Sequence, residues 1–573
     1  MKKIIYNIYV NDKEEIKKRK ESNNMSFYNK MNETVNNVSV TENGMVGYKT
    51  TYHPLLDMNF KIASYRSKSD LEVVKDFKAI LESNDAEYAL RFIFMVRDAR
   101  EGLGERRLFR LCIKELLNHN FENKDEIFHT IIKDLIPEYG RYDDMFVFMD
   151  TDYEDFVVDT IRVQLLTDHV NAKKGKSISL LAKWMPSENA SSKETKRLAR
   201  KFISALNATP ASYRQMLSGL RAYSKVIETQ TSANEWATID YSAVPSKANL
   251  KYKDAFLRHD EQRRRDFLAA LRNPEVAKAQ NLHINSGVNY PHEIVSKYST
   301  NRWGRVASYD EALEQLWKAL KPTAGLANTI VVRDGSGSMT NCIGGTKTTA
   351  LDVSTALAIY CSEQMEGDFK DKFITFSAEA KLIDLSNCGS LCSKLEKCYR
   401  EDDCSNTNLE NVFDLILKTA VDHKMSANEI PAQVLVISDM EFDPAGCGTW
   451  GWGGFNCDSN VINNAAAKFA RYGYKLPKLV FWNVASRTNT IPCKYNENGV
   501  LLVSGFSVNI LKMVLNGKTD PFEAVVEELG KERYNSIPLL QMRKVELKFP
   551  NHQVIRNAKT RRTLETPSFL NNK

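Results

Sequence analysis

The hydrophobic pattern of this chain changes at Pro322, and no other sequence feature constrains its fold as strongly. Upstream, apolar residues recur at helical spacing from residue 53 to residue 320, as in residues 105–118, where they fall three or four positions apart. Downstream, short β-branched runs alternate with helical segments, a pattern typical of a parallel sheet with crossover helices. The sequence therefore predicts a multidomain chain, with an α-helical, repeat or solenoid-like N-terminal half and an α/β C-terminal half whose sheet is mostly parallel.

Turn residues and periodicity place the expected elements. Breakers such as Gly102, Gly104, Pro137 and Pro210 separate the helical segments of the first half. Its expected helices span residues 87–100, 105–118, 126–136, 155–168, 177–185, 193–206, 211–219, 254–271 and 309–320. The strands expected in the second half span residues 329–333, 371–377, 433–438, 478–483 and 500–503, with helices at 348–364, 409–423, 460–472 and 507–515.

Shifts in composition divide the chain into expected domains. Residues 1–50, rich in Asn, Ser, Lys and Glu, predict a polar N-terminal arm. Residues 51–325 predict the α-helical repeat-like domain, with a basic segment at 171–265. Residues 326–530 predict the α/β domain, and residues 531–573 a C-terminal extension.

The overall composition is that of a folded globular protein. Of 573 residues, 43% are hydrophobic and 26% are charged, which allows several cores. No run approaches the roughly 20 consecutive apolar residues of a membrane-spanning helix. The first residues follow a short apolar patch with charges and show no small-residue cleavage site. We therefore expect a cytoplasmic or nuclear protein that is not secreted, with the cytoplasm as the first choice, and no membrane partner.

The positive charge of the chain is concentrated in one segment. The net charge is +7, yet residues 171–265 alone hold 19 Lys and Arg against 8 Asp and Glu. Such a concentration argues for a polyanionic partner, and tyrosines at positions 213, 223 and 252 offer stacking surfaces for bases. We expect RNA, with these candidate contacts: Lys193, Arg197, Arg200, Lys201, Arg214, Arg221, Lys251, Arg258 and Arg263. A solvated helix face without nucleic acid is the alternative.

Oxygen donors gather at the ends of two predicted strands. Asp334, Ser336 and Ser338 lie on a glycine-containing turn directly after the first strand. Thr407 precedes a predicted helix, and Asp439 follows another strand. Because the carboxyl ends of parallel strands share one edge of the sheet, these side chains can meet there. An all-oxygen shell suits Mg²⁺, or Mn²⁺ or Ca²⁺.

This set of residues resembles the metal-ion-dependent adhesion site of von Willebrand factor A domains, and the C-terminal half accordingly resembles that Rossmann-like fold. All five positions match the family pattern. The resemblance implies that Ser336 and Ser338 coordinate the cation directly and that Thr407 does so in one ligand-bound arrangement. It further implies that Asp334 and Asp439 act largely through waters, and that a protein partner completes the shell with an acidic residue.

A closer resemblance covers roughly residues 50–530. Segments such as REGLGERRLFR (100–110), VPSKANLKYKDAFLRHD (244–260) and VISDMEFD (436–443) are similar to an uncharacterised family of plants, bacteria and large viruses. That family joins a helical N-terminal half to a von Willebrand-like C-terminal half and brings no established activity. The architecture also resembles the Ro ribonucleoprotein (TROVE) family, whose helical repeats form a ring that binds RNA. This second resemblance is an analogy at the level of the fold.

An aromatic, glycine-rich loop follows the strand that ends near Asp439. It carries Trp450, Trp452 and Phe455, which suit a surface for partner contact near the rim of the metal site. The same side chains could instead fold back as a cap over the sheet or over the helical half.

The sequence points to a binding protein rather than to an enzyme. It contains no P-loop, nucleophile-elbow, HExxH or kinase signature, and no histidine neighbours the candidate metal ligands. We expect the helical half to bind RNA and the metal site to recruit a protein through a divalent cation. The alternative is a structural or assembly protein, a viral one included, that uses the metal site for protein contacts without nucleic acid.

Overall fold

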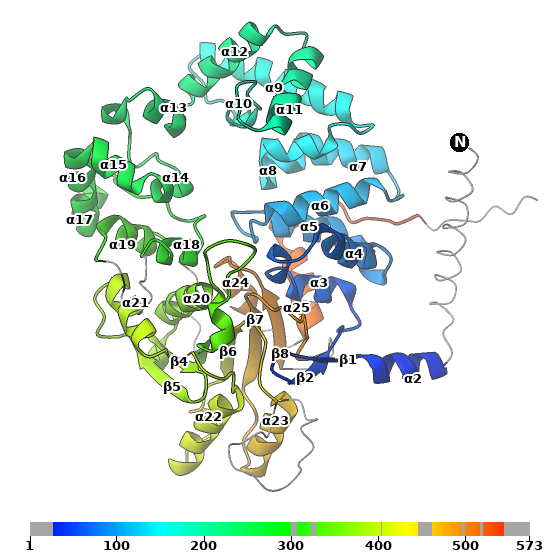
Figure 1. Ribbon diagram of the computed structural model, residues 1–573, viewed down its shortest axis with the longest axis vertical. Helices are drawn as coiled ribbons and strands as arrows, with labels where there is room; N and C mark the ends of the chain where they lie inside the picture. The colour runs from blue at the N-terminus through cyan, green and yellow to red at the C-terminus, as the bar shows by residue number, and fades with distance from the viewer. Residues whose placement is uncertain are drawn as a thin grey trace, which may run out of the picture.

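The computed structural model describes residues 27–298, 306, 308–322, 328–402, 404–444, 461–494, 499–515 and 520–543. Its two halves differ as the hydrophobic pattern predicts: the N-terminal half is helical, and the C-terminal half contains a mixed six-stranded sheet with helices (Figure 1). The prediction of a two-part architecture is confirmed at this level. No helix in the described ranges has both the length and the apolar character needed to cross a bilayer.

Local signals explain many of the helix starts in the first half. Ser69 and Glu72 form a capping box on the helix that begins at Asp70, and Thr209 caps the helix that begins at Pro210. The helices are α3 (Pro54–Phe60), α4 (Asp70–Leu81), α5 (Ala89–Arg97), α6 (Arg106–Leu117), α7 (Lys124–Thr130), α8 (Ile136–Tyr139), α9 (Glu154–Lys173), α10 (Leu181–Trp184), α11 (Lys193–Ala205), α12 (Pro210–Tyr223), α13 (Ile227–Ser232), α14 (Ser246–Lys251), α15 (Lys253–His259), α16 (Glu261–Arg272), α17 (Pro274–Ala279), α18 (Pro291–Val295) and α19 (Glu311–Lys318).

Two predicted helices differ clearly from the structure. The segment expected to be helical at 177–185 contains only the single turn of α10. The segment at 254–271 breaks at Asp260, whose backbone leaves the helical region with φ −147° and ψ 49°. The carboxylate of Asp260 accepts hydrogen bonds from the Tyr241 hydroxyl and from Arg263, so tertiary contacts hold the break in place.

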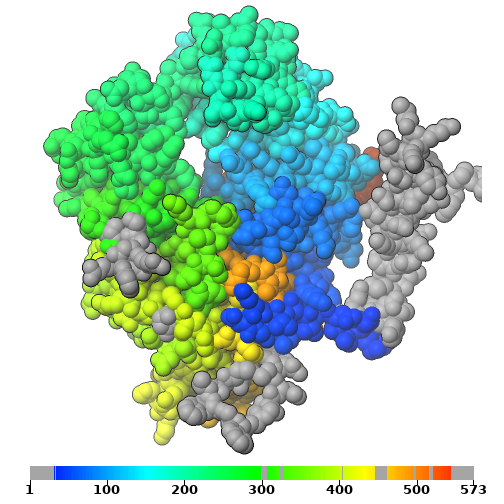
Figure 2. Space-filling view, in the orientation of Figure 1, coloured from blue at the N-terminus to red at the C-terminus, as the bar shows by residue number. Residues whose placement is uncertain are grey.

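The helical run leaves the α/β half and returns to it. Near its start α3 packs against strand β8 (Val500–Ser504), and near its end α18 packs against helix α20 (Ala350–Gln364). Figure 1 shows the intervening helices rising away from the sheet as an arch, and Figure 2 shows a narrow opening between its two sides. The α/β half therefore closes the arch of helices.

The sheet of the second half is parallel except at one edge. Its strands lie in the order β5 (Ala380–Asp384), β4 (Lys372–Phe376), β3 (Thr329–Asp334), β6 (Gln433–Ser438), β7 (Lys478–Asn483) and β8, with β5 antiparallel to β4. Every residue of β3 is buried, as expected for a central strand covered on both faces. The further helices are α21 (Leu391–Arg400), α22 (Glu410–Asp422), α23 (Val461–Arg471), α24 (Ile510–Leu515) and α25 (Pro521–Leu529).

In the second half, sequence reasoning missed β5, α21 and α25. Strand β5 is a short edge strand with two charged residues and an exposed Leu382, so it lacks a strong apolar alternation. Helix α21 contains two of the cysteines of the region 388–404, and both Cys392 and Cys398 are buried there as small apolar side chains. Helix α24 begins three residues later than the predicted boundary at 507.

The order of the strands decides where side chains can converge. From β3 the chain continues to β4 on one side, and later returns to β6 on the other side of β3. The carboxyl ends of β3 and β6 therefore flank the point at which the connections diverge, which is where α/β sheets bind ligands.

The N-terminal segment packs on the C-terminal half, and the C-terminal segment packs on the N-terminal half. Helix α2 (Phe27–Asn36) leads into a hairpin of β1 (Val38–Val40) and β2 (Val46–Tyr48), and Tyr48 exchanges two backbone hydrogen bonds of 2.9 Å with Ile491. At the other end, Arg91 donates to the carbonyl of Ile537, and the Leu540 amide donates to the carbonyl of Glu87. The two halves are thus linked by both ends of the chain.

A buried histidine lies where the returning helices meet the sheet. The His292 ring is stacked near Tyr290 and packs edge-on against Phe506, which follows β8. Burial, together with the cations Arg66 and Lys247, lowers the pKa of His292 to about 3. This contact therefore requires the neutral imidazole.

Acid should weaken this contact between the halves. Between pH 6.5 and 3 the unfolded chain binds a proton at His292 that the folded chain does not, so this residue makes stability rise with pH. We expect the loss of unfolding free energy from pH 7.5 to pH 5, measured by urea titration, to be about 2 kcal/mol smaller in His292→Leu than in the wild type. The exposed His423→Leu should keep the wild-type loss. An equal loss in both variants would contradict the assignment.

Candidate metal centre

Asp334 is the last residue of β3, and its carboxylate is fully buried and fixed by hydrogen bonds. One oxygen, Oδ1, accepts from the Ser336 amide at 2.9 Å, and the other, Oδ2, accepts from the Ser438 hydroxyl at 2.5 Å. Burial raises the pKa of Asp334, while these donors and Arg333 lower it. Both oxygens are therefore oriented by the ends of β3 and β6.

The turn after Asp334 presents two serine hydroxyls side by side. The Oγ atoms of Ser336 and Ser338 lie 3.1 Å apart. The turn is pressed against a neighbouring loop, because the Gly337 amide donates to the Ser405 carbonyl at 3.0 Å. A Cβ atom on Gly337 would lie 2.9 Å from the Cys404 carbonyl oxygen, so the close approach requires glycine.

Thr407 lies on that same neighbouring loop, before α22. Its side chain is buried, and its amide donates to Asp443 Oδ2 at 3.0 Å. In turn, the Asp443 amide donates to the Thr407 carbonyl. Its hydroxyl Oγ1 accepts from the side-chain amide of Asn43 at 3.1 Å. The structure thus brings the loop of Thr407 against the turn of Ser336 and Ser338.

Asp439 follows β6 and is buried beside the other carboxylate. Burial is the largest cause that raises its pKa, and the negative charges of Asp334 and Glu441 raise it further. Arg487 and the Ser338 hydroxyl act in the opposite direction. The Arg487 Nη1 atom lies 3.1 Å from Asp439 Oδ2 and also donates to the Ser338 carbonyl at 3.4 Å. Asp439 is therefore in direct electrostatic contact with the turn after β3.

The local charge is strongly negative. Five carboxylates lie around the turn and the Thr407 loop: Asp334, Asp439, Glu441, Asp443 and Glu42. Arg487 bridges Asp439 and Glu42. The Glu441 carboxylate is buried and accepts from the Arg487 and Thr488 amides at 2.8 and 2.9 Å. A divalent cation would offset this accumulation of negative charge, so the donor set fits such an ion.

The chemistry of the donors also narrows the type of metal. Within the described ranges no group of three His, Cys, Asp or Glu side chains could by itself hold a metal ion. A cation here would depend on the hydroxyls of Ser336, Ser338 and Thr407 as well as on carboxylates. Hard oxygen donors of this kind suit Mg²⁺, Mn²⁺ or Ca²⁺ rather than Zn²⁺.

Sequence reasoning missed the residues that surround these five. Glu441 and Asp443 lie within four residues of Asp439, so proximity in sequence could have found them. Arg487, Glu42 and Asn43 come from distant segments, and no sequence signal connects them with the site.

Arg333 supports the site from behind. Its guanidinium is fully buried, forms an ion pair with Asp402, and donates to the hydroxyls of Thr355 and Thr375 at 2.8 and 2.9 Å. Asp402 lies at the start of the segment that leads to Ser405 and Thr407. The ion pair therefore anchors this segment beside the turn after β3.

The predicted RNA-contact residues are spread over α11, α12 and α14 to α16, and several have partners within the chain. On α11, Arg197 pairs with Asp150 and Glu194, and Lys201 pairs with Asp150 and Glu154. These contacts lower the pKa of Asp150 to about 2.

Two further cations of that set bind backbone carbonyls. Arg221 donates to Ala182 and Met185, and Arg263 donates to Trp236 and Ile239. The remaining members are exposed at the surface: Lys193, Arg200, Arg214, Lys251 and Arg258.

One predicted stacking surface is wrong. Tyr213 is fully buried, and its hydroxyl donates to the Pro186 carbonyl at 2.9 Å. Its place at a core-facing position of α12 explains the burial, because Leu217 and Leu220 share that face. Trp450, Trp452 and Phe455, predicted to contact a partner, lie outside the described residues.

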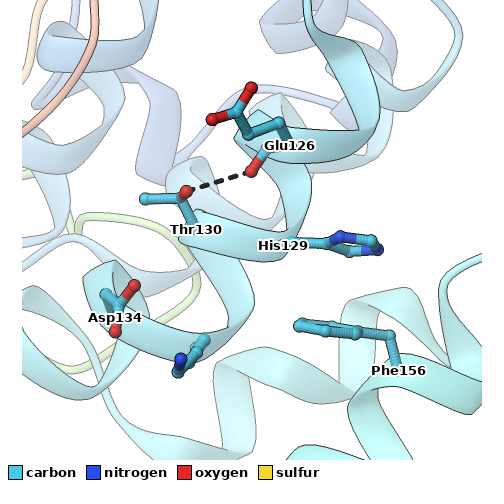
Figure 3. Close-up of a pocket in the computed structure, with 6 residues that line it drawn as sticks. Glu126, His129, Thr130, Asp134 and Phe156 are labelled. Carbon is cyan, nitrogen blue, oxygen red and sulfur yellow. Dashed lines mark hydrogen bonds between the residues drawn. The ribbon is translucent and has the colours of Figure 1, made fainter.

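A separate surface pocket lies in the helical half, between α7 and α9. It has a volume of about 390 Å³ and is lined by Glu126, His129, Thr130, Lys133, Asp134 and Phe156 (Figure 3). The His129 ring stacks on Phe156 at 3.9 Å, and Figure 3 shows the lining carboxylates pointing apart. This pocket contains none of the residues predicted from the sequence.

The chain is similar to proteins whose function is not described. A family model described as "Domain of unknown function (DUF7788)" matches residues 328–558, and another described as "Domain of unknown function (DUF2828)" matches residues 190–323. The chain is 28% identical over 516 residues to Uncharacterized protein L728 of Acanthamoeba polyphaga mimivirus. That alignment covers 84% of this chain and 85% of the viral protein.

Removing the support behind the site should cost considerable stability. In Asp402→Ala the Arg333 guanidinium remains buried without its carboxylate, which we expect to lower the unfolding free energy by about 3 to 5 kcal/mol in urea titrations. The double variant Arg333→Met with Asp402→Ala removes both charges and should lose less. If the single and double variants were equally destabilised, the ion pair would not be the cause.

Proposed function

We propose that this chain is a non-enzymatic binding protein whose α/β half holds a divalent cation, Mg²⁺ in the first place, and recruits a protein partner through it. The observation that carries the proposal is the convergence of the Asp334 turn, the Thr407 loop and Asp439 at the carboxyl ends of β3 and β6. This arrangement supports a von Willebrand factor A-like reading of the fold and of its metal-ion-dependent adhesion site.

The residues of the site would divide the work. Ser336 and Ser338 offer adjacent neutral oxygens, while Asp334 and Asp439 supply negative charge around them. A bound cation would supply positive charge to which an acidic group can bind. Because serine and threonine hydroxyls add no charge, such an ion retains affinity for a further carboxylate. An acidic side chain of a partner protein is the chemistry that this site would select.

We further propose that the helical half binds RNA. Support comes from the excess of positive charge in residues 171–265 and from exposed cations such as Lys193, Arg200 and Arg258. A second candidate function, protein assembly without nucleic acid, is favoured by the ion pairs of Arg197 and Lys201 with neighbouring carboxylates. Those pairs reduce the charge that α11 offers to phosphates.

Cation binding can be measured directly by calorimetric titration with Mg²⁺ and Mn²⁺. The double variant Ser336→Ala with Ser338→Ala removes both adjacent hydroxyls and should weaken binding at least tenfold, about 1.4 kcal/mol. The matched control Ser386→Ala, an exposed serine after β5, should bind like the wild type. If the wild type and the double variant bound the cations equally well, the site would lie elsewhere.

RNA binding can be tested by gel shift with structured and single-stranded RNA at several salt concentrations. Arg197→Glu with Arg200→Glu reverses two charges of α11 and should weaken binding about tenfold or more, with a shallower salt dependence, if this face contacts phosphates. A control with the same change of net charge is Lys418→Glu with Lys424→Glu, which changes one exposed lysine within α22 and one exposed lysine just beyond it. Unchanged affinity in the α11 variant would remove this face from the proposal and favour protein assembly.

A further inference from the structure

The N-terminal hairpin packs against the loop of Thr407 and the segment after Asp439, next to two of the candidate cation ligands. The loop between β1 and β2, residues 41–45, is held on the segment that follows Asp439: the Thr41 hydroxyl donates to the Phe442 carbonyl at 2.7 Å. The Asn43 side-chain amide donates to the Glu441 carbonyl at 2.6 Å and to the Thr407 hydroxyl at 3.1 Å. Figure 2 shows this blue segment against the surface of the α/β half. The loop therefore touches one of the proposed ligands.

The same loop brings an acidic side chain to the site. The Glu42 amide donates to Glu441 Oε2 at 2.8 Å, which fixes its backbone. Its carboxylate accepts from Arg487 Nε at 2.6 Å, and Arg487 Nη1 donates to Asp439 Oδ2. One guanidinium thus joins the carboxylates of Glu42 and Asp439.

The other carboxylates of the site are already committed. Donors from the turn and from β6 hold Asp334, and four donors from residues 486–488 hold Glu441. Asp443 accepts from the Thr407 amide. Within the part of the chain that the structure describes, the Glu42 carboxylate is held by Arg487 alone, and its side chain is 57% exposed. Glu42 is therefore the most exposed of the five carboxylates, and its one partner is itself a side chain.

We propose that Glu42 is the acidic group that completes the shell of the cation, supplied by the chain itself. The hairpin would act as an intramolecular ligand, and the acidic residue of a partner would have to displace Glu42 to bind. This inference rests on the cation site proposed above. It adds that, without a partner, the Glu42 carboxylate fills the coordination position that the partner's acidic residue would take. The docking of residues 41–45 on Thr407 and on the segment after Asp439 keeps this carboxylate at high local concentration.

The test uses the full chain and Mn²⁺ as the probe. Calorimetric titration should show Mn²⁺ binding about tenfold weaker in Glu42→Gln than in the wild type, while Glu42→Asp, which keeps the charge on a shorter side chain, should fall between them. The matched control Glu396→Gln, an exposed residue of α21, should bind like the wild type. Hydrogen exchange of residues 38–48 should slow when Mn²⁺ is added to the wild type and should change little in Glu42→Gln.

The outcomes separate this inference from the site itself. If Glu42→Gln binds Mn²⁺ as tightly as the wild type, or more tightly, while Ser336→Ala with Ser338→Ala loses binding, the cation site stands and Glu42 is not its ligand. If the wild type does not bind Mn²⁺, both proposals fall. Thermal unfolding in EDTA checks that each variant is folded, and Glu42→Asp guards against a loss caused only by misfolding.

Discussion

The burial of two carboxylates at the ends of neighbouring strands is the constraint on which the rest of the site depends. Desolvation of a carboxylate costs several kcal/mol unless hydrogen bonds or opposite charges offset it. The pairing of β3 with β6 forces Asp334 and Asp439 together, so the surrounding loops must supply donors. The turn after β3, the Ser438 hydroxyl and Arg487 provide them, and two of these contributions come from segments far away in sequence.

The crossing of the terminal segments gives the molecule a second level of organisation. The hairpin of β1 and β2 packs on the α/β half, and the segment after α25 packs on the helical half (Figure 1). Part of the surface of each half is therefore covered by a terminal segment from the other end of the chain. The hairpin also supplies Asn43 to Thr407, so the site includes residues from outside the sheet domain. The N-terminal segment, which its composition predicts to be a polar arm, therefore contributes a residue to the candidate metal centre.

Much of the fold could be predicted because its signals are local. The apolar runs of β3, β6, β7 and β8 and the helical spacing of the first half lie in contiguous sequence. Strand β5 was not predicted because an edge strand needs only a weak apolar face. The break at Asp260 was not predicted because it depends on tertiary hydrogen bonds from Tyr241 and Arg263. Charge patterns were the least informative, since Arg197 and Lys201 are paired with acidic residues that a count along the chain treats as unrelated.

The sequence by itself determined that a helical half precedes an α/β half and that Asp334, Ser336, Ser338, Thr407 and Asp439 stand at strand ends or loops where oxygens can meet. Only the tertiary structure decided which charges face these oxygens. Glu42 and Arg487 are separated from them by up to several hundred residues, and no spacing rule links such positions. The physical reason is that strand identity follows from local periodicity, whereas electrostatic neighbours depend on which segments the folded chain packs together.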